Sequence, residues 1–278
     1  MNIKQHLFPF AAALFALATV PSTCAAESSS FTAIVGDDIK TVFTAPGNWE
    51  AEDWKKLGWI TLAVVGTAVV ADRPVRDYMC QQSMMNSCPG AGSNPEVKNS
   101  ALTTIEHFGK NYAVGVMGGF YLAGVVTDNA KSVQVAQDLV AASVTSALVN
   151  QTIKVTLNRS RPRENLGNNN FVGYTGLNNN SSFSSGHTTE AFTLASVIAS
   201  HYDETWVSVL SYSTASLVGI ARMYHDAHFV SDVVASAFIG SYIGQTVVKH
   251  NSSLRGNNIA LLPMLGPDFT GVQLAGNF

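Results

Sequence analysis

Six largely apolar segments without Asp, Glu, Lys or Arg recur along the 278-residue chain, each 12 to 17 residues long. They are rich in Ala, Val, Gly and Ser, and polar or turn residues separate them, as expected for helices joined by loops. We therefore predict an all-α fold, a helical bundle of about six core helices. The predicted helices span residues 57–71, 112–127, 139–153, 191–202, 205–221 and 233–248.

The composition also limits the possible functions. Hydrophobic residues make up 46% of the chain and charged residues only 13%, so a sizeable core can form in a single domain. The first 26 residues contain one charge, that of Lys4, and without them 15 basic side chains face 19 acidic ones. Such an acidic balance argues against binding to nucleic acid.

The N-terminus has the pattern of a secretory signal peptide. Lys4 is followed by an apolar stretch at 7–20 and by small residues before Glu27, which predicts a signal peptide over residues 1–26. A lipid anchor on Cys24 is the less favoured alternative, because the residues before it lack the usual pattern. We expect an exported protein of the bacterial periplasm or cell envelope.

Two cysteines remain after that segment, Cys80 and Cys88. An even number of cysteines in an exported protein favours a disulfide, so we predict one between them, with two free buried thiols as the alternative.

The apolar segments are shorter than the roughly 20 residues that a membrane-spanning helix requires. On this ground we expect a soluble or peripheral protein rather than an integral one. Trp49, Trp54 and Trp59 precede the first segment and suit a bilayer interface as well as internal packing, so membrane association stays open.

Two further regions are not apolar helices. Residues 163–181 are rich in Asn and Gly and predict a long loop, either a lid over a site or a passive surface connection. At the end of the chain, two short apolar stretches flank Gly266, Pro267 and Asp268, which predicts a β-hairpin.

The first of three unusual clusters is KVTLNRSRP, from Lys154 to Pro162. Lys154 and Arg161 are seven residues apart, nearly two helical turns, so both could project from one helix face before Pro162 ends it. Paired arginine donors and a lysine charge suit a phosphate. Cations that complement a helix C-terminus are the alternative.

The second cluster is SSGH, from Ser184 to His187, and a helix-like stretch follows it. The backbone N–H groups of Ser185 and Gly186 would lie at a helix N-terminus, where anions bind. His187 could then give a proton to a leaving oxygen. A serine-rich helix cap with an incidental histidine is the alternative reading.

The third cluster contains Arg222, His228 and Asp232. His228 and Asp232 share a helix face, so the carboxylate could hold one ring nitrogen and prepare the other for attack on phosphorus. Arg222 would stabilise the oxygens of the phosphoryl group. Because its six-residue offset from His228 is not a same-face spacing, we predict a helix break between them, near 224–227.

We do not assign a catalytic role to the other histidines considered. We interpret His225 and Asp226 as loop residues, and His107, His201 and His250 as structural or surface residues. A metal site is disfavoured because the neighbouring cations would repel a divalent ion, so we predict neither metal nor cofactor.

Together the three clusters resemble the type 2 phosphatidic acid phosphatase superfamily: a lysine, six residues, Arg-Pro; then Pro-Ser-Gly-His; then Ser-Arg, five residues, His, three residues, Asp. All spacings match here. Ser184 replaces the proline of the second motif, and Ala221 replaces the serine of the third.

The resemblance implies a role for each matching residue. His228 would attack phosphorus, Asp232 would orient it, and His187 would protonate the leaving alcohol and later help to activate water. The phosphoryl group would be held without a metal by Lys154, Arg161, Ser185, Gly186 and Arg222.

We therefore expect an exported, metal-independent phosphatase that hydrolyses phosphate monoesters, either soluble phosphates or phospholipids, through a phosphohistidine. The alternatives are a vanadate-dependent haloperoxidase and a noncatalytic phosphate-binding envelope protein. The predicted layout is a signal peptide (1–26), an N-terminal extension (27–56), a helical phosphatase domain (57–250) and a C-terminal tail or hairpin (251–278).

Overall fold

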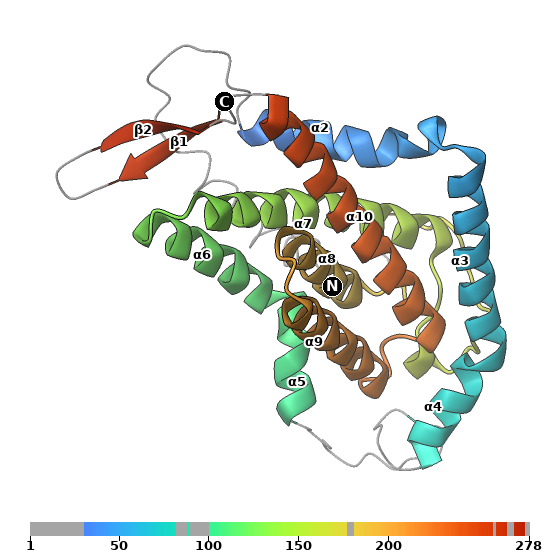
Figure 1. Cartoon of the computed structure of the whole chain (residues 1–278). Coiled ribbons are helices and arrows are strands. Elements are labelled where there is room, and N and C mark those ends of the chain that lie inside the picture. Colours follow the sequence, from blue (N-terminus) through green and yellow to red (C-terminus); the bar gives the residue numbers. More distant parts are fainter. Residues whose placement is uncertain are drawn as a thin grey trace.

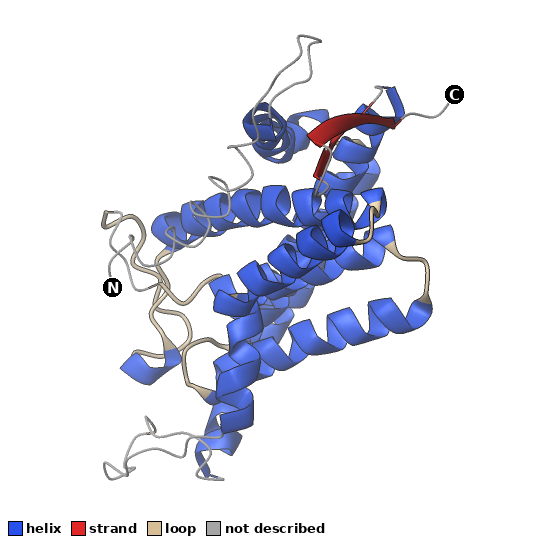
Figure 2. Cartoon of the chain, turned by 90° about the vertical axis from the view of Figure 1, so that its left-hand side faces the viewer, coloured by secondary structure: helices blue, strands red, loops and turns tan. Residues whose placement is uncertain are grey.

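The computed structural model describes residues 31–81, 88, 100–176 and 181–257, and two strands at 260–265 and 270–275. Up to residue 257 this part of the chain is helical apart from its loops, which confirms the all-α fold (Figures 1 and 2). The α-helices are α2 (Phe31–Thr44), α3 (Ala51–Val70), α4 (Asp72–Gln81), α5 (Ser100–Glu106), α6 (Asn111–Val126), α7 (Ala130–Leu157), α8 (Gly186–His201), α9 (Thr205–Tyr224) and α10 (Val230–Asn257). Short 3-10 helices are η1 (Ala45–Asn48), η2 (His107–Gly109) and η3 (Pro162–Glu164).

The six apolar segments correspond to six helices, α3, α6, α7, α8, α9 and α10. Most of these helices continue past the segment at one or both ends. For example, α7 begins nine residues before its uncharged segment, where the side chain of Asn129 caps it by accepting a hydrogen bond from the Ser132 N–H at 3.1 Å. Helices α2, α4 and α5 were not expected, because they are short and carry no long apolar run.

Helix α8 occupies the centre of the bundle and packs against α7, α9 and α10 (Figure 1). Helix α6 lies along α7, α3 lies along α10, and α2 packs across α7 and α10. Apolar side chains from several of these helices form the main core: Val35 and Val42 of α2, Leu139 and Val140 of α7, Leu194 and Val197 of α8, and Ile243 and Val247 of α10.

Helices α8 and α10 approach each other closely at Gly240. A Cβ atom at this position would lie 2.3 Å from the carbonyl oxygen of Thr189, closer than real Cβ atoms come to such an oxygen. Glycine is therefore required there. The close contact fixes the start of α8 relative to the start of α10, and both ends carry residues of the predicted site.

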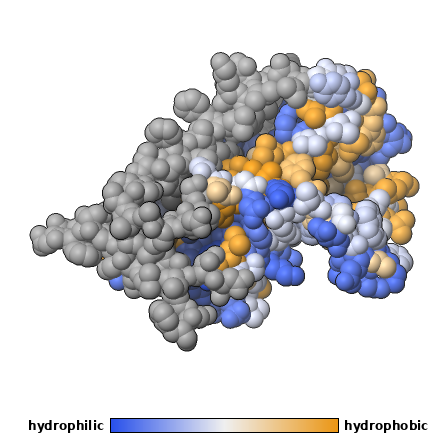
Figure 3. All heavy atoms as spheres, turned by 90° about the horizontal axis from the view of Figure 1, so that it is seen from above, coloured by the Kyte–Doolittle hydropathy of each residue, from blue (hydrophilic) through white to orange (hydrophobic). Residues whose placement is uncertain are grey.

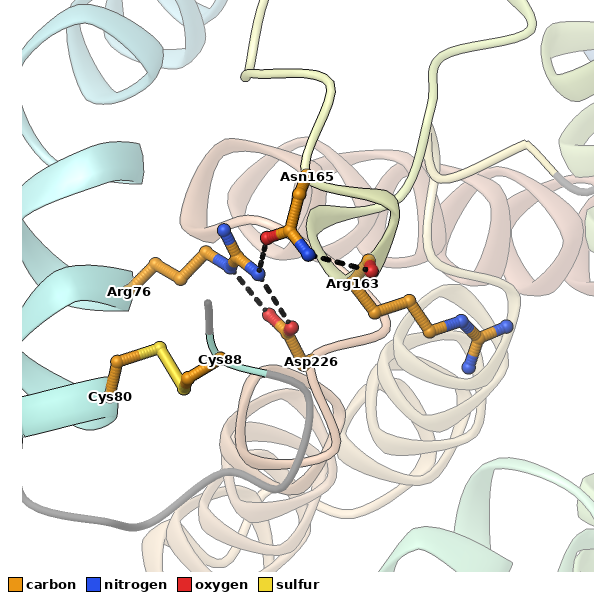
Figure 4. The surroundings of a disulfide bond; sticks show 6 residues. All are labelled: Arg76, Cys80, Cys88, Arg163, Asn165 and Asp226. Carbon is orange, nitrogen blue, oxygen red and sulfur yellow. Dashed lines mark hydrogen bonds and ion pairs between the residues drawn. A yellow bond between two sulfur atoms is a disulfide. The ribbon is translucent and has the colours of Figure 1, made fainter. Parts of the chain in front are cut away.

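Two further predictions are confirmed outside the bundle. Cys80 at the end of α4 forms a disulfide with Cys88, with the two Cα atoms 5.6 Å apart (Figure 4). Strands β1 (Ala260–Leu265) and β2 (Thr270–Ala275) pair in antiparallel fashion and form the predicted hairpin.

Three predictions concern residues outside the described part of the chain: the signal peptide over 1–26, the alternative role of Cys24, and the loop residues 177–180. The described part of the long loop begins with η3 and continues without regular structure to residue 176. Its role as a lid or passive connection, and the division of the chain into the predicted units, stay predictions.

Candidate phosphate site

Three chain segments meet beside the start of α8: the loop after α7, the turn that leads into α8, and the loop between α9 and α10. The predicted break in the third cluster is confirmed, because α9 ends at Tyr224 and α10 begins at Val230. His228 lies in this break and is 4% exposed. Because of this break, Arg222 and His228 can face the same site although a spacing of six residues would separate them on a helix.

Three cations surround His228. Burial lowers the pKa of its imidazole well below the usual value, and the charges of Arg161, Lys154 and Arg222 lower it further. The hydrogen bond to the Ser182 carbonyl opposes this change only in part. The structure thus brings three of the five predicted phosphate ligands, the cations, together around a histidine that is held neutral.

One prediction about the first cluster is wrong. Lys154 and Arg161 do not share a helix face, because α7 ends at Leu157 and Asn158 adopts a left-handed conformation with φ of 45°. Arg161 follows in extended backbone, directly before Pro162. The two cations approach the same site from a helix and from a loop, so their convergence depends on the turn at Asn158.

The cations are anchored by neighbours at the site. Lys154 Nζ donates to the carbonyl of Ser181 at 2.7 Å, and Arg161 Nη1 lies 3.4 Å from the carbonyl of Ala227. Burial and the nearby charges of Arg163 and Arg222 lower the pKa of Arg161 to about 10, so its guanidinium stays protonated at neutral pH. Backbone carbonyls therefore hold two of the three cations near His228, one in the turn before α8 and one in the loop that carries His228.

The predicted contact between Asp232 and His228 differs in the structure. His228 Nδ1 lies 2.7 Å from the carbonyl oxygen of Ser182, whereas Asp232 Oδ2 is 3.9 Å away, too far for a hydrogen bond. A carbonyl can only accept, so Nδ1 carries the proton and Nε2 keeps its lone pair. Asp232 reaches the histidine through Ser182, whose hydroxyl donates to the carboxylate.

Asp232 is fully buried and has three donors. It pairs with the guanidinium of Arg159, and it accepts hydrogen bonds from the Ser182 hydroxyl and, at 2.8 Å, from the Phe229 N–H. Ser182 and Arg159 were not among the predicted site residues, although Arg159 lies in the first cluster. Neither stands out in the sequence, because the contacts join positions 50 and 73 residues apart.

The second cluster forms the start of α8. Ser185 is its N-cap, with the side-chain oxygen accepting from the Thr188 N–H at 3.4 Å. However, the Ser185 N–H donates to the hydroxyl of Ser236 at 2.7 Å, so this donor is engaged within the protein. Its predicted contact with the anion stays a prediction. Ser184, which replaces the proline of the family motif, accepts from Asn150 Nδ2 at 2.8 Å.

Gly186 is the first residue of α8, and His187 follows it in the first turn, half-buried. The backbone of His187 lies against Gly109 of η2, where a Cβ atom would come within 2.2 Å of the His187 carbonyl oxygen. Glycine at 109 thus permits η2 to approach the start of α8.

Glu106 at the end of α5 is a further residue that the sequence did not reveal. Its Oε2 atom accepts from Arg222 Nη1 at 2.6 Å and lies 2.7 Å from His225 Nδ1. Burial would raise the pKa of Glu106, but the hydrogen bonds and charges of His225 and Arg222 outweigh it and lower the pKa to about 2. Glu106 therefore fixes the third cation, and His225 has a structural partner, in line with its reading as a loop residue.

Two of the remaining histidines, His201 and His250, agree with the structural reading. His201 Nε2 lies 2.8 Å from Asp138, and His250 Nδ1 lies 2.7 Å from Asp38, both far along the bundle from His228. Among the described residues, no group of three or more His, Cys, Asp or Glu side chains is arranged to hold a metal ion.

These features define a helical protein with a buried, cation-lined site around a neutral histidine. Residues 136–253 match the sequence model of the PAP2 superfamily. For this part of the chain, the match confirms the family predicted from the three motifs. The matched range includes every predicted catalytic and phosphate-binding residue.

Two similar proteins are phosphatases by name. A stretch of 66 residues is 38% identical to lipid A 1-phosphatase from Porphyromonas gingivalis, and it covers 23% of this chain and only 15% of that protein. The fold is similar to the crystal structure of the first transmembrane PAP2 type phosphatidylglycerolphosphate phosphatase from Bacillus subtilis, with a TM-score of 0.43 and 16% identity. This similarity covers 71% of this chain and 94% of the other. Both names agree with the predicted class, phosphoric monoester hydrolases.

The expected localisation is wrong. We favoured a soluble or peripheral protein because the uncharged segments were short, but the helices that contain them are long enough to change this conclusion. Helix length was underestimated, since polar residues extend the helices: α7 has 28 residues and is long and apolar enough to cross a membrane, although much of it is buried. Helices α3 and α4, bent by 42° at their junction, form a second candidate span.

The outer surface of the bundle agrees with this correction. Trp59 and Val69 of α3 are 73% and 76% exposed, and Trp206 of α9 is 67% exposed. Hydrophobic groups also gather on part of the face shown in Figure 3. Exposed apolar area on this scale is typical of a surface that contacts lipid or another protein.

Proposed function

We propose that this protein is a metal-independent phosphatase that hydrolyses lipid phosphate monoesters through a phosphohistidine at His228. One observation carries the proposal: a buried neutral histidine, with Nδ1 held by the Ser182 carbonyl, lies among three cations. Its Nε2 lone pair is the nucleophile, and the cations compensate the charge of a bound phosphate.

The reaction has two steps. In the first, Nε2 of His228 bonds to phosphorus, the bond from phosphorus to the ester oxygen breaks, and His187 gives that oxygen a proton. In the second, His187 takes a proton from water, whose oxygen attacks phosphorus as the phosphorus–nitrogen bond breaks. Inorganic phosphate leaves, and both histidines return to their starting protonation states.

Lys154, Arg161 and Arg222 hold the nonbridging oxygens in both steps. Arginine offers paired donors to two of these oxygens, while lysine supplies a mobile charge. Because the cations come from three separate segments of the chain, they can contact different sides of one phosphoryl group. This arrangement supports electrostatic stabilisation of the transition state without a metal ion.

A lipid phosphate is favoured over a soluble one by the outer surface of the bundle. Large apolar side chains are exposed on α3, α6 and α9, including Leu62, Val126 and Leu210. A bundle with these faces in lipid would meet its substrate at the membrane surface. The names of the two similar phosphatases support the same substrate class.

The test uses the full chain purified in detergent, assayed with an aryl phosphate, a lipid phosphate in mixed micelles and a short-chain soluble phosphate. We expect turnover of all three, with the highest kcat/KM for the lipid. Rapid quenching with 32P-labelled substrate should trap an acid-labile, base-stable phosphoenzyme that His228→Ala lacks. A protein that turns over substrate without this intermediate, or a labelled His228→Ala variant, would contradict the mechanism.

A further inference from the structure

Helix α4 contacts the site through the buried carboxylate of Asp72. This residue stands at the bend between α3 and α4, with its side chain fully buried. One carboxylate oxygen accepts from the Ser231 N–H at 2.8 Å, and the other accepts from the Ser231 hydroxyl at 2.7 Å and from Arg159 Nη2 at 2.6 Å. Asp72 thus joins α4 to the first turn of α10.

Arg159 connects this carboxylate with that of Asp232. Its Nη1 donates to Asp232 and, at 2.8 Å, to the Ser231 hydroxyl; its Nη2 donates to Asp72 and to the carbonyl of Asn168. Its Nε donates to the same carbonyl at 3.0 Å. A guanidinium has five N–H donors, and these five contacts engage all of them.

The saturation of Arg159 determines its role. Although it belongs to the cation-rich first cluster, it has no donor left for a phosphate, and its side chain is only 2% exposed. The Phe229 ring packs against the guanidinium at 4.3 Å from the ring centroid. Arg159 is therefore held in place by the protein on every side, in contrast to a ligand that must turn toward substrate.

The connection continues to the nucleophile. Arg159 pairs with Asp232, Asp232 accepts from the Ser182 hydroxyl, and the Ser182 carbonyl lies 2.7 Å from His228 Nδ1. Each link is a charged or neutral hydrogen bond between buried groups, where such contacts are strong and costly to break. A shift of Arg159 would therefore move the peptide that orients the histidine.

We infer that Asp72 is a positioning residue for the nucleophile, acting through Arg159 and Asp232 on the Ser182 peptide that holds His228. The inference rests on the proposed function and extends it by giving α4 a part in the reaction. The hydrogen-bond partners of Asp72 are Ser231 and Arg159, and neither is a proposed phosphate ligand. Its loss should therefore impair attack on phosphorus and leave substrate binding nearly unchanged.

A second pair of contacts holds the same loop from α4. Arg76 binds both oxygens of Asp226 at 2.8 and 2.9 Å, and its Nη2 donates to Asn165 at 2.8 Å (Figure 4). Asp226 has a positive φ of 48° and lies two residues before His228. Both ends of the loop that carries the nucleophile are thus attached to α4. The Cys80–Cys88 disulfide lies near the C-terminal end of this helix.

The test compares Asp72→Asn with Asp77→Asn, an exposed position on the same helix. With an aryl phosphate we expect Asp72→Asn to lower kcat by about 10- to 100-fold, the range expected when a catalytic group is displaced by about an ångström. Its KM and its inhibition constant for inorganic phosphate should change by less than about twofold. Asp77→Asn should match the parent protein in all three quantities.

Ser231→Ala provides a milder variant in case Asp72→Asn fails to fold. It removes the hydroxyl that contacts both Asp72 and Arg159, and we expect kcat to fall by roughly three- to tenfold. Asp72→Glu, which restores the charge, should recover part of the kcat lost in Asp72→Asn. A purely structural role would instead lower the melting temperature and the active fraction without changing kcat per active site, measured by phosphoenzyme burst.

The outcomes separate this inference from the proposed function. If His228→Ala abolishes turnover while Asp72→Asn and Ser231→Ala keep the parent kcat, the positioning role is excluded and the phosphatase stands. An increase in KM at constant kcat would also exclude it. If the parent protein shows no turnover, or His228→Ala keeps it, the proposed function itself fails.

Discussion

Two buried polar clusters lie at opposite ends of α7, α8 and α10, and they are built differently. The distal cluster joins α2 to the bundle through Asp38, Asp138, His201, His250, Asn251 and Arg255. In this cluster, the carboxylates of Asp38 and Asp138 are both in contact with side chains from among the other four residues. At the site end, by contrast, Lys154, Arg161 and Arg222 gather around one histidine.

The contrast shows how similar residue types serve different purposes. Asp138 accepts from Arg255 at 2.6 Å and from Asn251 at 2.9 Å, and His201 lies at 2.8 Å, so the contacts of this carboxylate are made within the protein. Such a cluster fixes the relative positions of helices. A concentration of cations repels itself unless an anion is added, which suits a site that binds phosphate.

The pKa values of two carboxylates show the same difference. Burial raises the pKa of Asp38 at the distal end, and its hydrogen bonds to His250 and Asn251 offset this only in part. At the site end, burial also opposes ionisation of Glu106, but His225 and Arg222 overcome it and lower the pKa to about 2. Glu106 therefore keeps its negative charge because of its two direct partners, Arg222 and His225.

The largest expected effect comes from the nucleophile. His228→Ala should lower kcat for an aryl phosphate by at least about 10³-fold, since no other group can replace the covalent intermediate. The melting temperature should stay within a few degrees of the parent. If activity and stability fell together, the contrast between a catalytic end and a structural end would be lost.

The distal cluster should behave in the opposite way. Asp138→Asn leaves Arg255 and His201 without their carboxylate, and breaking a buried ion pair costs about 3 kcal/mol or more in unfolding free energy. We expect a melting temperature about 10 °C lower. The kcat of the remaining folded protein, measured well below the transition, should match the parent. A reduced kcat at that temperature would show coupling between the two ends.

Glu106→Gln should have an intermediate effect on activity. Glutamine keeps the shape but loses the charge that fixes Arg222, so the guanidinium can leave the geometry needed for phosphate. We expect KM for an aryl phosphate to rise about tenfold, equivalent to roughly 1.4 kcal/mol, with a smaller change in kcat. Glu204→Gln, at the exposed opposite end of the helix that carries Arg222, is the matched comparison. An unchanged KM in Glu106→Gln would exclude the anchoring role.

Several of these features could be predicted from the sequence. The uncharged segments located the core helices because burial excludes charge from a helix interior face, and the six-residue offset before His228 indicated the break after α9. The paired cysteines indicated the disulfide. Each of these signals comes from residues that lie close together in the sequence, so it can be recognised without the structure.

The partners of the site residues could not be predicted in the same way. Asp72 contacts Arg159 across 87 residues, and Glu106 contacts Arg222 across 116, so no spacing rule applies. The placement of Lys154 and Arg161 on one helix failed because nothing in the local pattern required α7 to end at Leu157. Membrane location was misjudged for a related reason: uncharged length does not equal helix length.

The smallest expected effect concerns acid. A carboxylate whose pKa falls from 4.5 in the unfolded chain to about 2 in the folded protein adds stability above pH 4.5, and this contribution is lost as the pH falls toward 2. Glu106→Gln removes the contribution and its pH dependence. The parent should therefore lose roughly 5 °C more than the variant between pH 5 and pH 3.

Asp38 should change stability with the opposite sign, because its folded pKa is raised. The ionised carboxylate is disfavoured in the folded state, so protonation as the pH falls through the folded pKa stabilises the protein, and Asp38→Asn removes that gain. Melting curves of the parent and both variants in one detergent, at pH 7, 5 and 3, measure the two slopes together. If the slopes had the same sign, the opposite pKa shifts of Glu106 and Asp38 would be contradicted, and with them this difference between the site and the distal cluster.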